Sequence, residues 1–334
     1  MSSYLEFLKD PRAYPHRAGE VILLQTHISY VFLAGSYVYK VKKPVDFGFL
    51  DFTTLARRRY YCEEELRLNR RLCPDIYLDV VPIRQKDDHF ELGGSGGRIV
   101  EYAVKMVRMP AEGMMDKVIE AGNLTRHSLG KIVDILVPFY QQAETGPEIV
   151  EAGSRDSVAG NIRDNFQQTE PFIGCPVLCR EDFDRLRGYA EGVLADDQLF
   201  RRRQEEGWIR DGHGDLHSSN ICLGERVWIF DCIEFNRGLR YGDLAADLAF
   251  LAMDLDYRGQ EQDSIWFVDT ISQRLNDPGL HAVLNFYKCY RAYVRGKIGL
   301  LTGQDREVDE STRAASLQRA GRYFKLAVRY AEQS

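Results

Sequence analysis

The chain has 334 residues, of which 44% are apolar and 28% are charged, a composition typical of globular proteins. It is long enough to bury a sizeable core and to form two lobes. The net charge of −6 argues against general nucleic-acid binding, because that binding needs a basic surface that neutralises phosphates.

The first part of the chain is predicted to consist mainly of strands. Residues 26–29, which end at Ser29, are predicted to form the turn between the first two strands. A third strand follows Gly35, and its period of two places Lys40 and Lys42 on the same face. The predicted strands span residues 20–25, 30–34, 37–44, 77–84 and 98–107.

One helix interrupts these strands and runs through residue 72, with Thr53 or Thr54 as its N-cap. At about 100° per residue, Glu65 lies close in phase to the apolar residues of this helix, whereas Glu63 points away from them. We therefore expect Glu65 to face inward, with Glu64 as the alternative.

Residues 108–113 break the pattern between the β-rich part and a helical part. We therefore expect an N-terminal lobe at 1–107, a hinge at 108–113 and a C-terminal lobe at 114–334. Residues 154–174 lack helical spacing and are predicted to be an irregular connector. The predicted helices span residues 116–121, 129–144, 180–203, 244–256, 280–301 and 311–332.

The stretch from His213 to Asp231 contains the residues with the clearest chemistry. Asp215 lies on a predicted loop, Asn220 follows five residues later, and Asp231 ends the hydrophobic hairpin that comes next. Phosphoryl-transfer enzymes use one Asp to orient the acceptor hydroxyl and take its proton, and an Asn and a second Asp to hold Mg²⁺ against the nucleotide phosphates. The stretch therefore predicts a metal–phosphate site.

This stretch resembles the H-x-D-x-x-x-x-N loop and the following D-x-G-like position of the aminoglycoside phosphotransferase and choline kinase superfamily. Residues 242–249 similarly resemble that superfamily's G-D-P-x-x-D-L-A segment. The resemblance implies an α+β, protein-kinase-like fold with a small β-rich N-lobe, one αC-type helix and a larger, mainly helical C-lobe. It also implies ATP and Mg²⁺ as cofactors, Asp215 as catalytic base, and Asn220 and Asp231 as metal ligands.

In the N-lobe, the resemblance implies that Lys40 holds the α- and β-phosphates, with Lys42 as the alternative. Glu65 would pair with that lysine. Ser29 matches a serine that aminoglycoside phosphotransferases often carry in the loop over the phosphates. The expected activity is transfer of the γ-phosphate of ATP to a hydroxyl of a small-molecule acceptor.

Three departures from the kinase pattern leave alternatives open. Gly214 stands where many protein kinases have the Arg that binds a phosphorylated activation loop, and only a short segment separates Asp231 from Gly242. A protein kinase is therefore the less favoured alternative. Residues 232–234, Cys-Ile-Glu, replace the usual F-G, so the other alternative is a non-catalytic, pseudokinase-like nucleotide-binding regulator.

A basic stripe on the predicted helix 280–301 bears on the acceptor. Spacings of three and four residues place Lys288, Arg291 and Arg295 on one side of this helix. The resemblance puts this helix beside the acceptor pocket, so the stripe predicts a neutral or anionic acceptor. The alternative is a solvated face that pairs with nearby acids.

Features that the sequence lacks bear on the expected location and partners of the protein. The seven cysteines show no paired C-x-x-C spacing. No apolar run is close to the length of a membrane span, which is about 18 residues. We therefore expect a cytoplasmic protein without a nucleic-acid or membrane partner.

The resemblance, over residues 25–301, is to a branch sometimes fused to a P-loop ATPase. Since the chain has no G-x-x-x-x-G-K-[ST] motif, that ATPase is expected as a separate partner.

Overall fold

The computed structural model describes residues 3–306 and 308–333, which form two compact units. The first unit comprises Met1–Glu120 and Ser219–Arg237, and the second comprises Ala121–Ser218 and Gly238–Ser334. The first unit contains α1 (Tyr4–Lys9), β1 (Val21–Gln25), β2 (Ser29–Ala34), β3 (Tyr37–Lys42), α2 (Leu55–Asn69), β4 (Tyr77–Lys86), β5 (His89–Leu92), β6 (Arg98–Val107), α3 (Met115–Glu120), β8 (Ile221–Leu223) and β9 (Val227–Ile229). The second contains α4 (Arg126–Gln142), α5 (Pro147–Ala152), α6 (Arg155–Thr169), α7 (Arg180–Leu194), α8 (Asp197–Glu205), β7 (Ile209–Asp211), β10 (Tyr241–Asp243), α9 (Leu244–Tyr257), α10 (Glu261–Leu275), α11 (Leu280–Gln304) and α12 (Glu310–Glu332). The expected α+β class, with a β-rich N-terminal part and a helical C-terminal part, is confirmed.

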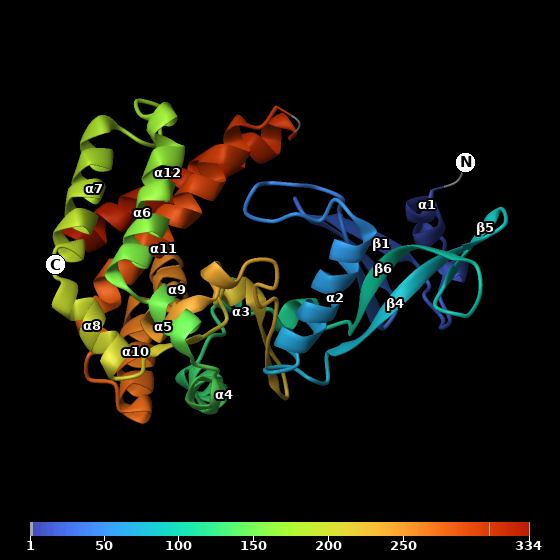
Figure 1. The fold of residues 1–334 in the computed structure, drawn as a ribbon, viewed down its shortest axis with the longest axis horizontal. Helices are drawn as coiled ribbons and strands as arrows, with labels where there is room; N and C mark the ends of the chain where they lie inside the picture. The colour runs from blue at the N-terminus through green and yellow to red at the C-terminus, as the bar shows by residue number, and fades with distance from the viewer. Residues whose placement is uncertain (1–2, 307, 334) are drawn as a thin grey trace. The chain divides into compact units, whose positions relative to one another are not determined.

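The first unit is built on an antiparallel sheet of six strands in the order β1-β2-β3-β6-β4-β5, and α2 lies along one face of it (Figure 1). Side chains alternate between the two faces along β3. Tyr39 and Val41 pack into the apolar cluster on the face covered by α1, whereas Val38 packs with α2 on the other face. By the same alternation, Lys40 and Lys42 lie on the face that α2 covers.

Helix α2 begins as the sequence predicts and ends at Asn69, three residues before the predicted end at 72. Thr54 is its N-cap, and its hydroxyl accepts a hydrogen bond from the backbone N–H of Arg57 at 3.2 Å. The inward side of the helix carries charge, because Arg58 and Glu65 are both buried there. Arg58 donates to the buried carboxylate of Glu101 at 2.8 and 2.9 Å, so the charge of this arginine is matched.

The hairpin β8–β9 belongs to the first unit although it comes late in the chain, and the expected lobe boundaries at 107 and 113 stay a prediction. Cys222 of β8 forms a β-bridge with Met114, which follows the expected hinge. The aromatic rings of Trp228 and Phe230 pack against the cluster beneath α2 that contains Val38. These contacts join a late segment of the chain to the N-terminal sheet.

The two longest helices of the second unit, α11 and α12, pack closely side by side (Figure 1). A Cβ at Gly296 would lie 2.8 Å from the Phe324 ring, and one at Gly299 would lie 2.9 Å from the carbonyl oxygen of Ser316. Glycine at these positions therefore permits the close approach of the two helices. Within the described ranges, no helix combines the length and apolarity needed to cross a membrane.

Two helix predictions for this unit were wrong. The segment expected to be an irregular connector contains α6, whose N-cap Ser154 accepts the backbone N–H of Ser157 at 3.3 Å. The buried residues Ala159, Ile162 and Phe166 keep helical spacing, but polar residues between them weaken the pattern. The helix predicted over 180–203 is interrupted, because Asp196 caps a new helix, α8.

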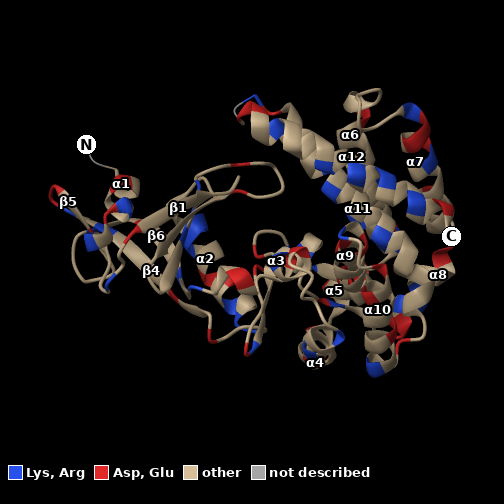
Figure 2. Ribbon diagram, turned by 180° about the vertical axis from the view of Figure 1, so that it is seen from behind, with Lys and Arg blue, Asp and Glu red and all other residues tan. Residues whose placement is uncertain are grey.

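Charged residues of both signs are distributed along the outer helices of this unit (Figure 2). On α7 and α8 they form pairs one turn apart, such as Arg185 with Glu181 at 2.9 Å and Arg201 with Asp197 at 2.5 Å. Such exposed pairs contribute little to stability, because water and salt screen them.

Arg203, at the end of α8, forms a buried ion-pair triad, in contrast to these surface pairs. It donates to Asp243 at 2.7 and 2.8 Å and to Asp277 at 2.5 and 2.8 Å. Replacing Arg203 by methionine should lower the free energy of unfolding by about 3–5 kcal/mol, because two buried carboxylates lose their counter-ion. Urea unfolding would measure this loss. The control is Arg163→Met, which removes an exposed partner of Glu191 and should change stability little.

Candidate active site

A cluster of two lysines and three carboxylates lies in the first unit, where β3 faces α2. We call Lys40, Lys42, Glu65, Asp231 and Glu234 the lysine–carboxylate cluster. The Lys40 ammonium donates to Asp231 Oδ1 at 2.6 Å and lies 2.9 Å from Glu65 Oε1, at an angle unsuited to a hydrogen bond. The Lys42 ammonium donates to Glu65 Oε2 at 2.7 Å and to Glu234 Oε1. Glu65 therefore lies between the two lysines.

Exposure to solvent increases from one end of this cluster to the other. The side chains of Lys42 and Glu65 are completely buried, that of Lys40 is 13% exposed, and that of Asp231 is 42% exposed. Only Lys40 and Asp231 are thus accessible to a ligand. Lys42, the alternative to Lys40, is enclosed by protein.

The charges in the cluster stabilise one another. Burial acts to raise the pKa of Glu65, but Lys40 and then Lys42 outweigh it and lower the pKa of this carboxyl to about 2. Burial acts to lower the pKa of Lys40, but Asp231 and Glu65 outweigh it, and the pKa lies well above its ordinary value. Both groups are therefore charged at neutral pH.

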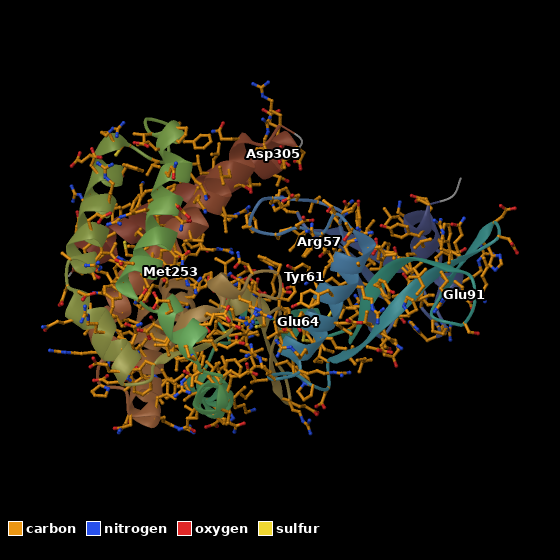
Figure 3. The ribbon with its side chains drawn as sticks, viewed as in Figure 1. Arg57, Tyr61, Glu64, Glu91, Met253 and Asp305 are labelled. Atoms are coloured by element: carbon orange, nitrogen blue, oxygen red, sulfur yellow. The ribbon has the colours of Figure 1, made fainter. Side chains whose placement is uncertain are left out.

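Glu64, the alternative to Glu65, lies on another side of α2. Figure 3 labels it together with Arg57 and Tyr61, which precede it by seven and three residues. Its carboxylate is bound by Arg67 at 2.9 and 3.0 Å. Between these two glutamates, Glu65 is the one in contact with the lysines.

The backbone that follows the hairpin holds Asp231 in place. The φ angle of Asp231 is +62°, a left-handed conformation that is uncommon for residues other than glycine and occurs often at functional sites. The backbone N–H of Cys232 donates to Asn69 Oδ1 at 2.9 Å, and Asn69 Nδ2 donates to the carbonyl oxygen of Glu65 at 2.9 Å. The Cys-Ile-Glu segment thus connects Asp231 to α2, and its Glu234 neutralises Lys42.

Asn220 and Asp231 lie at the same end of the β8–β9 hairpin. The backbone N–H of Phe230 donates to the carbonyl oxygen of Asn220 at 3.0 Å, which extends the ladder by one residue beyond β8 and β9. Amide and carboxylate oxygens suit Mg²⁺, which typically takes one or two protein ligands and completes its shell with phosphates and water. The donor set of these two residues therefore fits the implied metal.

Ser29 lies in a strand and not in the turn where the sequence predicts it. The turn is shorter than predicted, and Ser29 is the first residue of β2, opposite Lys42 of β3. Its side chain is completely buried, and its role beside the phosphates stays a prediction. Local sequence did not indicate this, because the start of a strand beside a turn depends on the neighbouring strand.

Asp215 lies in the second unit, on a loop that α9 holds by two carboxylates. Asp247 accepts the backbone N–H groups of His213 at 2.6 Å and Gly214 at 2.8 Å. Asp254, two turns further along α9, accepts the backbone N–H of Ser218 at 2.9 Å. The loop is therefore held on both sides of Asp215.

Two histidines of the loop interact with Asp215. The backbone N–H of Asp215 donates to Nδ1 of His213, which is completely buried, at 3.2 Å. His217 Nε2 lies 3.4 Å from Asp215 Oδ2. Burial acts to raise the pKa of Asp215, but His217, followed by Arg295 and His213, outweighs it and holds the pKa well below its ordinary value. The carboxylate is ionised at neutral pH, as a proton acceptor requires.

The basic stripe of α11 is not the exposed surface that its spacing alone allows. Lys288 lies 2.5 Å from Asp256 Oδ2, and Arg291 lies 3.8 Å from Asp247 Oδ1. Lys288 and Arg291 are both buried against α9. The expectation that all three stripe residues serve the acceptor is therefore wrong for these two, since their charges are matched by acids of the fold.

Sequence reasoning missed Glu234 and Asp254. Glu234 was noted only as a departure from a kinase pattern, although a charged residue among apolar neighbours is itself a signal of a buried partner. Asp254 lies seven residues after Asp247, which places both on the same side of a helix. That spacing could have identified the second support of the loop.

The lowered pKa of Glu65 predicts how stability depends on pH. The group has an ordinary pKa of 4.5 and a folded-state pKa of about 2, so its stabilisation is present above 4.5 and is lost as the pH falls from 4.5 toward 2. Glu65→Gln should flatten this part of the stability curve, measured by urea unfolding at a series of pH values. Glu63→Gln, an exposed neighbour on the same helix, should leave the slope unchanged. Equal slopes for wild type and Glu65→Gln would contradict the prediction.

Three solved structures are similar to this chain over most of its length. A choline kinase from Cryptosporidium parvum Iowa II has a TM-score of 0.58 at 10% identity, covering 99% of this chain and 96% of that chain. A choline/ethanolamine kinase family protein from Mesorhizobium loti has a TM-score of 0.55 at 14% identity, covering 99% of both chains. Aminoglycoside phosphotransferase APH(3'')-Id from Streptomyces rimosus ATCC10970, in complex with ADP and streptomycin, has a TM-score of 0.51 at 16% identity, covering 88% and 99%.

The chain has the fold of the choline and aminoglycoside kinases. The resemblance expected from the sequence is confirmed at the level of this kinase fold. No protein-family model matches the chain. The roles of individual residues in the kinase fold stay predictions.

Curated relatives are longer than this chain. "Uncharacterized protein Rv2004c" of Mycobacterium tuberculosis and "Uncharacterized protein Mb2027c" of Mycobacterium bovis are each 33% identical over 277 residues, which cover 82% of this chain and 53% of the relative. The chain thus spans about half the length of the curated relatives it matches. The separate P-loop ATPase partner stays a prediction.

Proposed function

We propose that the protein is a Mg²⁺- and ATP-dependent phosphotransferase that transfers the γ-phosphate to a hydroxyl of a small molecule. The observation that carries the proposal is the position of Lys40, whose ammonium is in ion-pair contact with both Glu65 and Asp231. A lysine paired with a helix glutamate, beside an acid suited to a metal, is the arrangement that kinases use to hold nucleotide phosphates. The nucleotide in the Streptomyces rimosus structure supports ATP as the donor.

The proposed chemistry assigns each residue one task. Lys40 binds the phosphates, and Asn220 and Asp231 hold Mg²⁺, which when bound neutralises the charge of those phosphates. Asp215 orients the acceptor hydroxyl and takes its proton. The acceptor oxygen forms a bond to the γ-phosphorus while the bond from that phosphorus to the β–γ bridging oxygen breaks, and ADP leaves. His213 braces the loop and transfers no proton. We place the activity in the cytoplasm, since the seven cysteines form no disulfide.

A labelling experiment tests the proposal. The protein is incubated with Mg²⁺, radiolabelled ATP and fractionated metabolites, and labelled products are separated by chromatography. We expect a labelled product with the wild type and none with Asp215→Asn. Mg-ATP binding without any product would favour the non-catalytic regulator, and product that appears equally with Asp215→Asn would overturn the assignment of the base. Label on the protein itself would favour a protein kinase.

A further inference from the structure

Arg295 occupies a special position on the basic stripe of α11. Arg291 and Lys288, one and two turns before it, are matched by Asp247 and Asp256 of α9. Arg291 also donates to the carbonyl oxygen of Ala246 at 3.1 Å. Residues three and four apart share one side of a helix, so Arg295 lies on the side of α11 that faces α9. Asp247 and Asp254 of α9 support the loop that carries Asp215.

The charge of Arg295 is balanced differently from the charges of Lys288 and Arg291. Its guanidinium lies 5.7 Å from the centroid of the Tyr323 ring. Among residues 3–306 and 308–333, no carboxylate lies within the 4.0 Å ion-pair distance of this group. Asp254 is close enough to interact electrostatically with Arg295. It already accepts a hydrogen bond from the backbone N–H of Ser218 at 2.9 Å and lies 3.3 Å from Arg258.

Asp215 is the other carboxylate that interacts electrostatically with Arg295. A partly buried guanidinium without a close counter-ion favours an anion, and its planar group of donors can bind a carboxylate or phosphate through two parallel hydrogen bonds. An acceptor whose hydroxyl is at Asp215 would bring its own substituents close to Arg295. An anionic substituent would therefore supply the missing partner.

We propose that Arg295 binds a carboxylate or phosphate group of the acceptor, so that the substrate is an anionic hydroxy compound. The inference rests on the proposed phosphotransferase function and specifies its substrate class. It assigns to Arg295 the recognition of the acceptor and leaves nucleotide binding to the lysine–carboxylate cluster. Polycationic acceptors would be disfavoured, because Arg295 would repel them.

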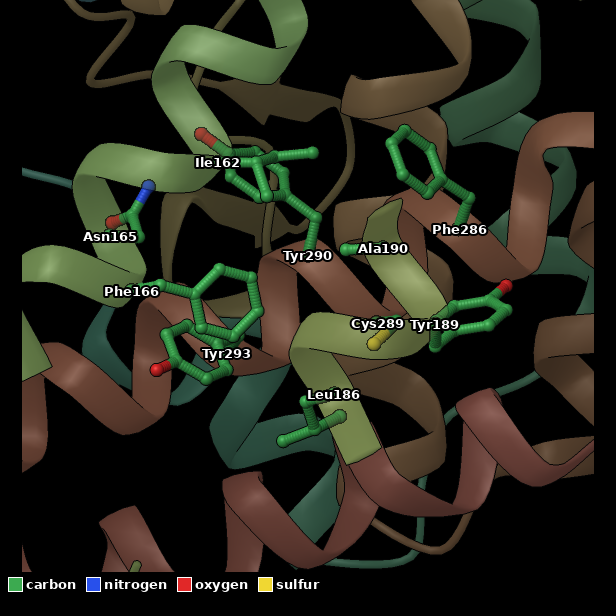
Figure 4. A pocket seen from close by; sticks show the side chains of 10 residues that line it. All are labelled: Ile162, Asn165, Phe166, Leu186, Tyr189, Ala190, Phe286, Cys289, Tyr290 and Tyr293. Carbon is green, nitrogen blue, oxygen red and sulfur yellow. The ribbon is translucent and has the colours of Figure 1, made fainter. Parts of the chain in front are cut away.

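The apolar cavity among α6, α7 and α11 does not compete for this role (Figure 4). Phe166, Tyr290 and Tyr293 are among the residues that line it. Its volume is about 20 Å³, enough for roughly one water molecule. It is therefore a gap in the packing of the second unit.

The test compares acceptors that differ in charge. ADP formation from Mg-ATP is measured with glycerate, glycerol 3-phosphate, glycerol and kanamycin, for the wild type and for Arg295→Gln, Arg295→Lys and Arg322→Gln. Arg322 is the matched control, an exposed arginine 4.3 Å from the centroid of the Tyr257 ring. We expect Arg295→Gln to raise the KM of the anionic acceptor at least tenfold, with Arg295→Lys between it and the wild type and the KM of ATP unchanged. Activity with glycerate or with glycerol 3-phosphate distinguishes a carboxylate from a phosphate.

Other outcomes separate this inference from the proposed function. Preferred phosphorylation of glycerol or kanamycin, or an equal loss of kcat with every acceptor in Arg295→Gln, would overturn the acceptor role and keep the phosphotransferase. A shift in the pH profile of kcat with no change in KM would also overturn it, since Arg295 would then act only through Asp215. If no acceptor is phosphorylated, calorimetric binding of glycerate and glycerol 3-phosphate decides. Binding lost in Arg295→Gln supports the anion site, and no binding, or equal binding, overturns it.

Discussion

Replacing Asp215 by alanine should reduce phosphotransfer by at least about 10²–10⁴-fold, the contribution typical of a positioned base, and leave the affinity for Mg-ATP within a few-fold. Replacing Asp231 by alanine should instead weaken Mg-ATP binding, because a metal ligand is lost. The structure gives a second reason to separate the two residues. Asp231 contacts Lys40 in the first unit, whereas Asp215 belongs to a loop supported by α9 in the second.

Calorimetric titration with Mg-ATP and steady-state kinetics on both variants would measure these effects. Asp156→Ala, which removes an 81% exposed carboxylate, is the control and should change neither quantity. Equal weakening of nucleotide binding by Asp215→Ala and Asp231→Ala would refute the division of roles. In that case Asp215 would also serve the metal or the phosphates.

Replacing Lys42 by methionine should lower the free energy of unfolding by about 3–5 kcal/mol, the cost of leaving a buried charge without its partner. Lys42 is completely buried, and its ammonium is the hydrogen-bond donor to both Glu65 and Glu234. Lys40→Met should act differently. It should raise the KM for ATP or depress kcat with a smaller loss of stability, because its partner Asp231 is open to solvent.

The double variant Lys42→Met/Glu234→Leu provides the control for this prediction. It removes a positive and a negative charge together, and replacing a buried ion pair by apolar residues is often neutral. We expect the double variant to recover much of the stability that Lys42→Met loses, as measured by urea unfolding in a double-mutant cycle. Losses that simply add would show that Lys42 and Glu234 do not stabilise each other.

The parts of the molecule that depend on local spacing could be predicted from the sequence. The period of two along β3 put Lys40 and Lys42 on one face, and the helical phase of α2 selected Glu65. Most strands of the first unit, together with α2, α9 and α11, were found because their apolar residues recur at the period of the element, whereas the short strands β5, β7 and β10 were not predicted. Where the pattern was diluted by polar residues, as in α6, the element was missed.

Tertiary structure alone decided which charges meet. Lys40 and Asp231 are 191 residues apart in the chain, and Lys42 and Glu234 are 192 residues apart. It also decided that Lys288 and Arg291 are matched by acids of α9 while Arg295 has no carboxylate at ion-pair distance among the described residues. Periodicity specifies the side of an element on which a residue lies. What that side contacts depends on the packing of segments distant in sequence, and burial then determines whether a charge must find a partner there.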